Sequence, residues 1–390
     1  MATGLAADPP VQALIDRVRA ARADKVTLDI RGGASKAFYG ETPLGEPLDM
    51  APLAGISCYE PSELVVTVRA GTPLAELEAV LAEKGQCLAF EPPRFADLSA
   101  VPAMVGGNVG GTSRGTSGGT VGGMVAAGLA GPSRACAGSV RDHVLGATLL
   151  SGRAEVMAFG GQVMKNVAGY DVSRLLAGSM GTLGAILQVS LKVLPLARAV
   201  TTLRFECEQA EALKRLNAWG GRPLPLNASA WWSGVLVLRL AGAAAAVRAA
   251  ATQLGDEFGG EEVEPALAAT FWAGMRDHSD EFFAGAAKAV AAGATLWRLS
   301  VPQTAAVLKV SGEHLVEWGG AQRWVVTTAA AATLREAAAR VGGHATVFRG
   351  DKSAGAFTPL SPTLARIQRQ TLAAFDPDGV FNRSRLYPEL

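Results

Sequence analysis

Apolar and polar residues follow one another along the first part of the chain in a way that predicts strands and helices in turn. Apolar residues recur at helical spacing over residues 10–22, which predicts an amphipathic helix. Residues 25–31 alternate apolar and polar side chains and contain several β-branched residues, so they are expected to form a strand, and residues 64–69 (LVVTVR) are expected to form a second one. A second helix is expected over residues 74–84, where the glycine that follows ends it.

The pattern changes after Pro195. From Asp142 to that point, strand-like runs are separated by glycine turns, whereas beyond it glycine becomes rarer and alanine-rich helical runs alternate with strand-like runs. A last helix is expected from Ser361 to about Phe375, because a serine cap and a proline in the first turn are typical helix-start signals. These patterns predict an α+β chain with a domain boundary near residue 196.

The composition is that of a folded protein without a charge bias. Of 390 residues, 49% are hydrophobic and 18% charged, and 36 Lys and Arg balance 35 Asp and Glu to a net charge of +1. This balance argues against a basic nucleic-acid-binding protein and against disorder. No apolar run reaches the roughly 18 residues of a membrane-spanning helix, and no signal peptide is recognisable. We therefore expect a soluble cytoplasmic protein with no membrane span.

The spacing of cysteines and glycines argues against several common cofactor sites. The four cysteines form no C-x-x-C pair, which disfavours zinc and ferredoxin-type iron–sulfur sites. None of the 46 glycines is separated from another by a single residue, so the chain has no G-x-G-x-x-G loop. No glycine is followed by lysine, so the P-loop is absent too. A phosphorylated cofactor would have to be held by a different structure.

Three glycine-containing segments are candidates for such a structure. In the first, IRGGASKAF (residues 30–38), a strand ends in two glycines, and successive backbone N–H groups can turn inward around an anion. We expect Gly33 to adopt a left-handed backbone there. Ser35 and Lys36 add a hydrogen-bond donor and a charge. The alternative is an ordinary turn at the end of a strand.

The second segment is a tract over residues 106–131 that contains eleven glycines. A flexible linker is the alternative, but strand-like segments continue on both sides, so we expect the backbone of the tract to approach a ligand closely. Two G-x-S-x-G matches occur, at Ser113 and Ser117. A hydrolase nucleophile needs a strand before it, and these serines follow glycine-rich chain instead.

The third segment covers residues 160–184. Four polar side chains lie among its glycines and apolar residues: Lys165, Asn166, Asp171 and Arg174. A turn-rich surface connection explains this segment by itself as well as a ligand site does.

Together and in this order, the three segments resemble the FAD-binding domain of the vanillyl-alcohol oxidase / p-cresol methylhydroxylase type, which binds FAD without G-x-G-x-x-G. Within that type, the chain is similar to the FAD-binding subunits of bacterial glycolate oxidase (glycolate dehydrogenase). The stretches that carry the resemblance are RAGTPLAELEAVLAEKGQCLAFEPPRF, GGMVAAGLAGP, GSVRDHVLG, FGGQVMKNVAGYDVSRLLAGSMGTLG and DPDGVFNRSRLYP. The likeness is dense over residues 25–195, thin in the region that follows, and clear again at the C-terminal end.

The resemblance implies a two-subdomain FAD-binding domain over residues 1–196, an α+β cap domain over 197–360, and a return of residues 361–390 to the FAD domain. Gly106–Gly107 stays an alternative to Gly122–Gly123 as the pair that meets the flavin. The implied cofactor-binding residues are Arg31, Gly32, Gly33, Ala34, Ser35 and Lys36 at the pyrophosphate, Gly122, Gly123 and Ala126 at the flavin and ribityl chain, Gly181, Thr182 and Gly184 along the cofactor, and Asn382 beside the flavin. Because Ala34 stands where the family often has a flavin-linking histidine, noncovalent FAD is expected.

The implied activity is oxidation of a small 2-hydroxy acid, glycolate, to glyoxylate. The implied partners are a second FAD-containing subunit and an iron–sulfur subunit, and any membrane association would come through that complex. Related dehydrogenases bind a metal near the substrate with H-x-G-D-G-N-x-H, whereas this chain has only GGHATVFRG, so no metal is expected. His344 and Arg349 are the substrate-facing candidates, with a core histidine and a solvated arginine as the plainer explanation.

Two other functions stay open at this point. The chain is a noncatalytic, flavin-containing assembly or electron-relay subunit if its partner oxidises the substrate. A flavin oxidase that acts alone is the third possibility.

Overall fold

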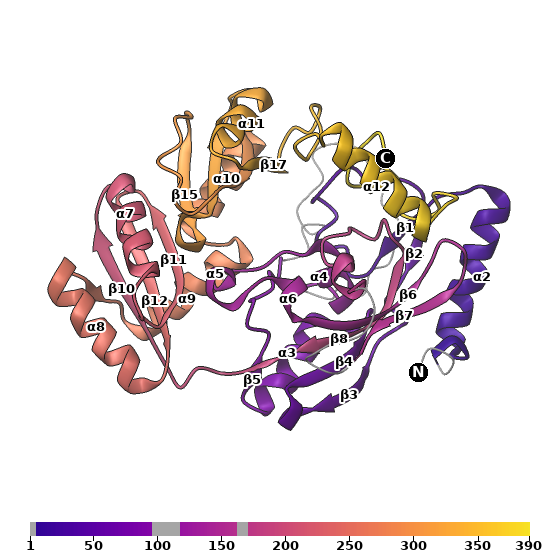
Figure 1. The fold of residues 1–390 in the computed structure, drawn as a ribbon, viewed down its shortest axis with the longest axis horizontal. Helices are drawn as coiled ribbons and strands as arrows, with labels where there is room; N and C mark the ends of the chain where they lie inside the picture. Colours follow the sequence, from indigo (N-terminus) through magenta and orange to yellow (C-terminus); the bar gives the residue numbers. More distant parts are fainter. Residues whose placement is uncertain (1–4, 96–117, 162–170) are drawn as a thin grey trace.

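The computed structural model describes residues 5–95, 118–161 and 171–390, and two antiparallel sheets dominate it (Figure 1). The first sheet has five strands, in the order β3 (Ile56–Glu60), β4 (Val65–Arg69), β8 (Ala185–Lys192), β6 (Val144–Leu150) and β7 (Val156–Gly160). The central strands β4, β8 and β6 consist mostly of buried apolar residues. They pack with the helices α3 (Leu74–Glu83) and α4 (Val121–Ala127) in one hydrophobic core.

Smaller elements surround this sheet. A parallel pair, β1 (Leu28–Arg31) with β2 (Glu46–Asp49), follows the N-terminal helix α2 (Pro9–Asp24). The other short elements here are β5 (Gln86–Cys87) paired with β9 (Leu194–Pro195), the helices α5 (Arg134–Ala137) and α6 (Val140–His143), and the 3-10 turns Pro61–Glu63 and Ser173–Leu176, whereas a third such turn, Trp318–Gly320, lies between β15 (Glu313–Glu317) and β16 (Gln322–Thr327) of the second sheet.

The C-terminal part of the chain lies against the first unit, which is the five-stranded sheet together with the smaller elements around it (Figure 1). After the helix α12 (Pro362–Phe375), the chain runs beside β1, where the Leu28 N–H donates to the Val380 carbonyl at 2.6 Å. The Asn382 N–H donates in turn to the Leu28 carbonyl at 2.9 Å. These bonds bring residues from the two ends of the sequence to the same place.

The second sheet has eight antiparallel strands. Their order is β13 (Glu261–Glu262), β10 (Ala199–Glu206), β12 (Val235–Gly242), β11 (Leu226–Trp232), β15 (Glu313–Glu317), β16 (Gln322–Thr327), β14 (Thr295–Ser300) and β17 (His344–Arg349). One face packs against α7 (Gln209–Gly220), α8 (Ala244–Phe258) and α11 (Ala331–Arg340).

The other face of the second sheet meets α9 (Pro265–Asp277), α10 (Glu281–Ala291) and the first unit. Its hydrophobic cluster includes Tyr39, Phe95 and Met180 from the first unit together with Trp324 and Phe348 from the sheet. The two units are therefore joined by a shared, aromatic-rich core.

The predicted α+β class is confirmed by this architecture. The division of the chain that we propose, at about residues 196 and 361, is supported by where the two sheets end and where the C-terminal helix begins. The helix α4 inside the glycine-rich tract is a feature that the sequence patterns did not predict. Among the residues described, no helix combines the length and apolar character needed to cross a bilayer.

Candidate functional site

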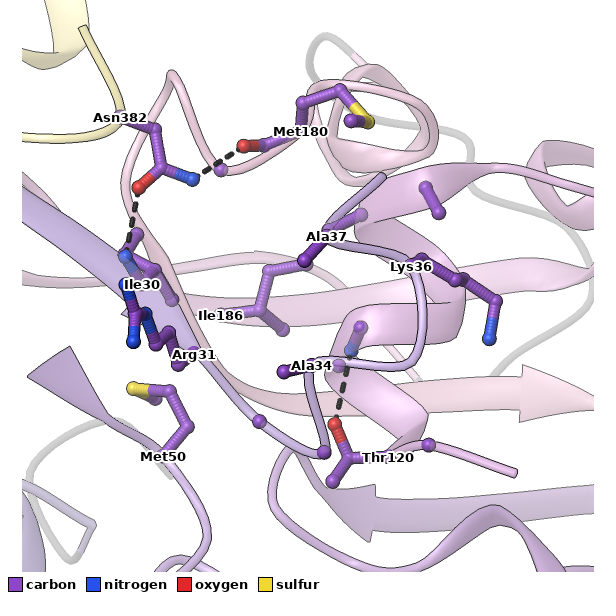
Figure 2. Close-up of a pocket in the computed structure, with 18 of the residues that line it drawn as sticks. Ile30, Arg31, Ala34, Lys36, Ala37, Met50, Thr120, Met180, Ile186 and Asn382 are labelled. Carbon is purple, nitrogen blue, oxygen red and sulfur yellow. Dashed lines mark hydrogen bonds between the residues drawn. The ribbon is translucent and has the colours of Figure 1, made fainter. Parts of the chain in front are cut away.

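A cavity of about 440 Å³ opens where β1, α4, the turn before β8 and the C-terminal segment meet (Figure 2). Of the thirteen cofactor-binding residues expected from the resemblance, all except Thr182 line it. The lining residues are Asp29, Ile30, Arg31, Gly32, Gly33, Ala34, Ser35, Lys36, Ala37, Pro43, Met50, Ala70, Gly119, Thr120, Gly122, Gly123, Ala126, Ala127, Met180, Gly181, Gly184, Ile186, Asn382 and Arg385.

The loop after β1 presents a run of free backbone donors to this cavity. Within the described ranges, no acceptor faces the backbone N–H groups of residues 32–36. Consecutive N–H groups of this kind form a concave site for an anion. The expectation of a left-handed backbone at Gly33 is wrong, because the left-handed residue of the loop is Ala34, with φ at 50°. The chain direction changes one residue later than the glycines suggested.

Basic side chains add positive charge at the same loop. Lys36 Nζ lies 3.5 Å from Ser35 Oγ and 5.6 Å from the centre of the Phe95 ring. Burial lowers the pKa of Lys36 to about 8, although the carboxylates of Asp277 and Glu78 partly oppose this shift. An anion bound at the loop would favour the protonated lysine. Lys36 is thus suited to hold a phosphate.

Arg385 is a lining residue that the sequence reasoning missed. Its side chain is buried, and one guanidinium nitrogen donates to the Ala37 carbonyl at 2.8 Å. The other terminal nitrogen, Nη1, is buried without a hydrogen-bond partner, and desolvation lowers the pKa of Arg385 to about 10. The carboxylates of Asp29 and Glu41 oppose this shift only in part, so the unused donor is suited to a bound anion. Only its place in DPDGVFNRSRLYP, three residues after Asn382, pointed to it.

The start of α4 serves close packing rather than anion binding. Its first N–H groups already donate within the chain, from Val121 to Thr72 at 2.9 Å and from Gly122 to Ala70 at 2.8 Å. The Thr120 hydroxyl caps the helix by accepting from the Gly123 N–H at 3.3 Å (Figure 2). A Cβ on Gly122 would lie 2.6 Å from Cβ of Ala70. The glycine therefore lets the helix approach β4 and leaves the cavity wall without side chains.

Asn382 joins three segments at the edge of the cavity. Its Oδ1 accepts from the Ile30 N–H at 2.8 Å, and its Nδ2 donates to the Met180 carbonyl at 2.6 Å (Figure 2). Gly181 is required beside it, because a Cβ there would lie 2.6 Å from Nδ2 of Asn382. Thr182 donates its hydroxyl to the Ser179 carbonyl and lines a neighbouring cavity with the C-terminal segment.

The two substrate-facing candidates are not brought together. His344 begins β17 and Arg349 ends it, which separates them by about 17 Å at the usual rise of a strand. His344 is exposed at the strand end, whereas the Arg349 guanidinium lies 3.6 Å above the ring of Phe38. In the ranges that the structure covers, no three His, Cys, Asp or Glu residues gather as a metal site.

Some residues of the sequence analysis lie outside the described ranges. These are Gly106, Gly107, Ser113, Ser117, Lys165 and Asn166. Of the third segment, Asp171 and Arg174 form an ion pair with each other at 2.8 Å, and neither lines the cavity. Of the two glycine pairs proposed to meet the flavin, only Gly122–Gly123 lies in the described ranges, and both of its residues line the cavity.

These features fit FAD. The free N–H groups and the Lys36 and Arg385 side chains supply what a pyrophosphate needs, and the glycine and alanine walls leave room for a flat ring system. The cavity volume lies in the range of about 300–1,000 Å³ that is typical of small-molecule sites.

Comparisons with known proteins give the same picture. Residues 10–119 match the family described as "FAD binding domain". The chain is 42% identical over 380 residues to the glycolate oxidase subunit GlcE of Escherichia coli (strain K12), covering 97% of this chain and 98% of that protein. The glycolate oxidase subunit GlcD of Bacillus subtilis (strain 168) is 36% identical over 75 residues, which is 19% of this chain and 16% of that protein.

Two further similarities concern more distant proteins. A D-lactate dehydrogenase of Anaerostipes hadrus is 32% identical over 168 residues, which cover 43% of this chain and 30% of that protein. The solved structure of an alkyldihydroxyacetonephosphate synthase superposes with a TM-score of 0.62, covering 95% of this chain and 74% of that one. At 14% identity, this last likeness shows a shared fold only.

Proposed function

The chain belongs to the family of the glycolate oxidase subunit GlcE, and from that premise we propose that it is the FAD-carrying subunit of a glycolate dehydrogenase complex. The predicted membership and the predicted FAD-binding domain are confirmed by this similarity and by the domain match. The proposed reaction oxidises glycolate to glyoxylate, and the complex passes the electrons onward. The proposed location is the cytoplasm, with membrane association only through the complex.

One observation carries the cofactor part of this proposal: five successive backbone N–H groups that find no acceptor in the described part of the chain line a cavity beside Lys36 and Arg385. We propose that residues 31–36 hold the pyrophosphate and that Gly122, Gly123 and Ala126 lie along the flavin. When bound, FAD supplies a hydride acceptor. The residues of this chain orient it and exclude water from its phosphates.

We propose that the FAD is noncovalent. Ala34 occupies the loop position at which the family often has a linking histidine, and its side chain can form no bond to the flavin. Cys136, which would be the suspect if a link existed, lies on α5 beside a different cavity of about 350 Å³. Acid precipitation of the purified protein should therefore leave the yellow colour in the supernatant. Colour that stays in the pellet would contradict the noncovalent proposal.

The proposed partners are a second FAD-containing subunit and an iron–sulfur subunit. The names of the relatives GlcE and GlcD support a heteromeric assembly, because both denote subunits of glycolate oxidase. The iron–sulfur partner rests on the family resemblance alone. We expect the isolated, FAD-loaded chain to show little glycolate-dependent dye reduction and co-expression with both partners to restore it.

The competing function, a noncatalytic relay or assembly subunit, is favoured by the separation of His344 from Arg349. An anaerobic experiment distinguishes the two. The isolated chain is mixed with glycolate while the visible absorption of its flavin is followed, and bleaching within seconds indicates direct oxidation. Unchanged absorption, together with full activity of a complex whose copy of this chain cannot bind FAD, would establish the assembly role. Full turnover by the single chain would instead show an enzyme that acts alone.

A further inference from the structure

Two arginines on the face of the second sheet that meets the first unit have no acidic partner. The side chains of Arg298 on β14 and Arg349 on β17 form no hydrogen bond or ion pair with any residue in the described ranges. Arg349 lies over the Phe38 ring at 3.6 Å, and the Arg298 guanidinium lies 5.7 Å from the centre of the Tyr39 ring. Both guanidinium groups thus lie beside the segment that directly follows the loop of the FAD cavity.

Each of the other arginines of the same sheet makes at least one hydrogen bond or ion pair, although Nη1 of Arg323 is buried without a partner. Arg204 on β10 pairs with Glu206 at 3.1 Å, and Arg239 on β12 pairs with Glu91 at 2.7 Å. Arg323 on β16 donates to the carbonyls of Gly320 and Ala305. Arg298 and Arg349 are therefore exceptions in their own sheet. Both residues are half-buried, so their guanidinium groups offer an anion donors that the described part of the protein does not use.

A histidine without a partner lies in the same aromatic cluster. His278 follows α9 with a left-handed backbone, φ at 57°, and its ring stacks on Phe283 with the centres 3.9 Å apart and the planes 4° from parallel. The rings of Trp324 and Phe348 contact it at 4.9 and 5.2 Å. Its Nδ1 is buried without a hydrogen-bond partner. The left-handed backbone is explained by the end of α9, so it is the unsatisfied Nδ1 that points to a role with a ligand.

The charges around this histidine keep it neutral. Burial, and then the positive charges of Arg349 and Arg298, hold the pKa of His278 well below its usual range. The acidic neighbour Asp277 is already engaged, because it accepts from the Arg276 side chain and from the Arg94 N–H. Two free cations and one neutral imidazole thus lie within the same cluster.

We propose that Arg349 and Arg298 bind the carboxylate of a small 2-hydroxy acid, and that a nitrogen of His278 accepts a hydrogen bond from its hydroxyl group. Guanidinium groups are suited to carboxylates because their N–H groups match the two oxygens. The inference rests on the proposed function, and it assigns substrate binding to this chain rather than to its partner. Arg349 keeps the role for which the sequence suggested it, but its companions are Arg298 and His278 instead of His344.

The carboxylate part is tested by calorimetric titration of the FAD-loaded full chain with oxalate, which has carboxylates but no C–H bond to oxidise. Glycolamide, whose amide replaces the carboxylate of glycolate, is the neutral comparison. We expect Arg349→Met and Arg298→Met each to weaken oxalate binding about tenfold or more. The oxalate affinity of Arg349→Lys should lie between those of the parent and Arg349→Met, because lysine keeps the charge but lacks the paired N–H groups of the guanidinium. Arg204→Met, in the same sheet, is the matched control and should bind as the parent does.

The hydroxyl part needs a second ligand pair. With the flavin chemically reduced so that no oxidation occurs, the parent should bind glycolate more tightly than acetate. His278→Phe keeps the ring stacking and removes both nitrogens, so this preference should disappear while oxalate affinity stays within twofold. An unchanged preference would remove His278 from the proposal.

Several results would overturn the site. It fails if the parent does not bind oxalate, if glycolamide binds equally well, or if both methionine variants bind oxalate like the parent while their FAD content and melting temperature show that they are folded. These outcomes are separable from failure of the proposed function. If the chain binds oxalate through Arg349 but belongs to no glycolate-oxidising complex, the proposed site stands and the proposed function fails. If the complex is active but the chain does not bind oxalate, the proposed function stands and the proposed site fails.

Discussion

Replacing Arg385 by methionine should change FAD affinity and apoprotein stability in opposite directions. In the structure, the buried guanidinium makes one hydrogen bond, to the Ala37 carbonyl at 2.8 Å, and leaves Nη1 without a partner. Methionine has a similar length and no charge, so it fills the space without a desolvation penalty. The variant therefore separates the role of the charge from the role of packing.

The magnitudes follow from the surroundings of the guanidinium. Burial lowers its pKa from 12.5 to about 10, which corresponds to a penalty of about 3 kcal/mol for the charged form. The hydrogen bond to the Ala37 carbonyl stabilises the folded apoprotein by about 1.5 kcal/mol, which is less than this penalty. Removing the charge should therefore leave the free energy of unfolding of the apoprotein unchanged or raise it. A charge-assisted bond to a phosphate contributes about 1.5–3 kcal/mol, so FAD binding should weaken roughly 10- to 100-fold.

The assay is a fluorescence titration of the apoprotein with FAD, combined with urea unfolding of the apoprotein. Arg383→Met is the matched control, because Arg383 lies two residues away, is exposed, and does not line the first cavity. Its FAD affinity should equal that of the parent. The reasoning is refuted if Arg385→Met binds FAD as tightly as the parent. A loss of apoprotein stability above about 2 kcal/mol would show that the guanidinium is structural instead.

Three further predictions concern the same cavity. Gly32→Ala places a Cβ 2.2 Å from Oγ1 of Thr120 and disturbs the cap of α4. FAD affinity should therefore fall, and the free energy of unfolding should drop by about 1 kcal/mol. Gly285→Ala is the control, because its Cβ would meet nothing within 4 Å, and it should not weaken FAD binding. Because the pKa of Lys36 is about 8 without an anion, FAD affinity should be constant below that pH. Above it, FAD binding must take up a proton, so the affinity should fall by up to about tenfold per pH unit. Lys36→Met should remove this pH dependence, and a parent affinity that stays constant to pH 9.5 would contradict the prediction. Gly122→Val should prevent FAD retention on gel filtration, because its side chain would collide with Ala70, and a variant that retains full FAD would show that α4 can move away from β4.

Much of the local structure could be predicted from the sequence, because local patterns report local interactions. Helical spacing predicted α2, and strand-like runs predicted β1 and β4. The absence of G-x-G-x-x-G and the IRGGASKAF loop indicated a pyrophosphate site of another kind, and the loop does line the cavity. These inferences needed only residues that are neighbours along the chain.

The helix α4 could not be predicted in this way. Two adjacent glycines in VGGMVAA lower its intrinsic helix propensity by about 1 kcal/mol each relative to alanine. The helix forms because Thr120 caps it locally and because its glycine face packs on Ala70, and the second cause depends on the position of β4. Composition alone could not distinguish this helix from a linker.

Residues far apart in the sequence meet at the site only through the tertiary structure. The backbones of Leu28 and Asn382 are hydrogen-bonded although they lie near opposite ends of the sequence, and this pairing places Arg385 at the cavity. Sheet register places Arg349 over Phe38 and leaves His344 at the far end of β17, although the two are close in sequence. The sequence by itself determined segments such as α2, β1 and β4, and it indicated which loop to examine as a pyrophosphate site. The tertiary structure alone decided which charged side chains face that loop, because burial and pairing are set by contacts that no local pattern contains.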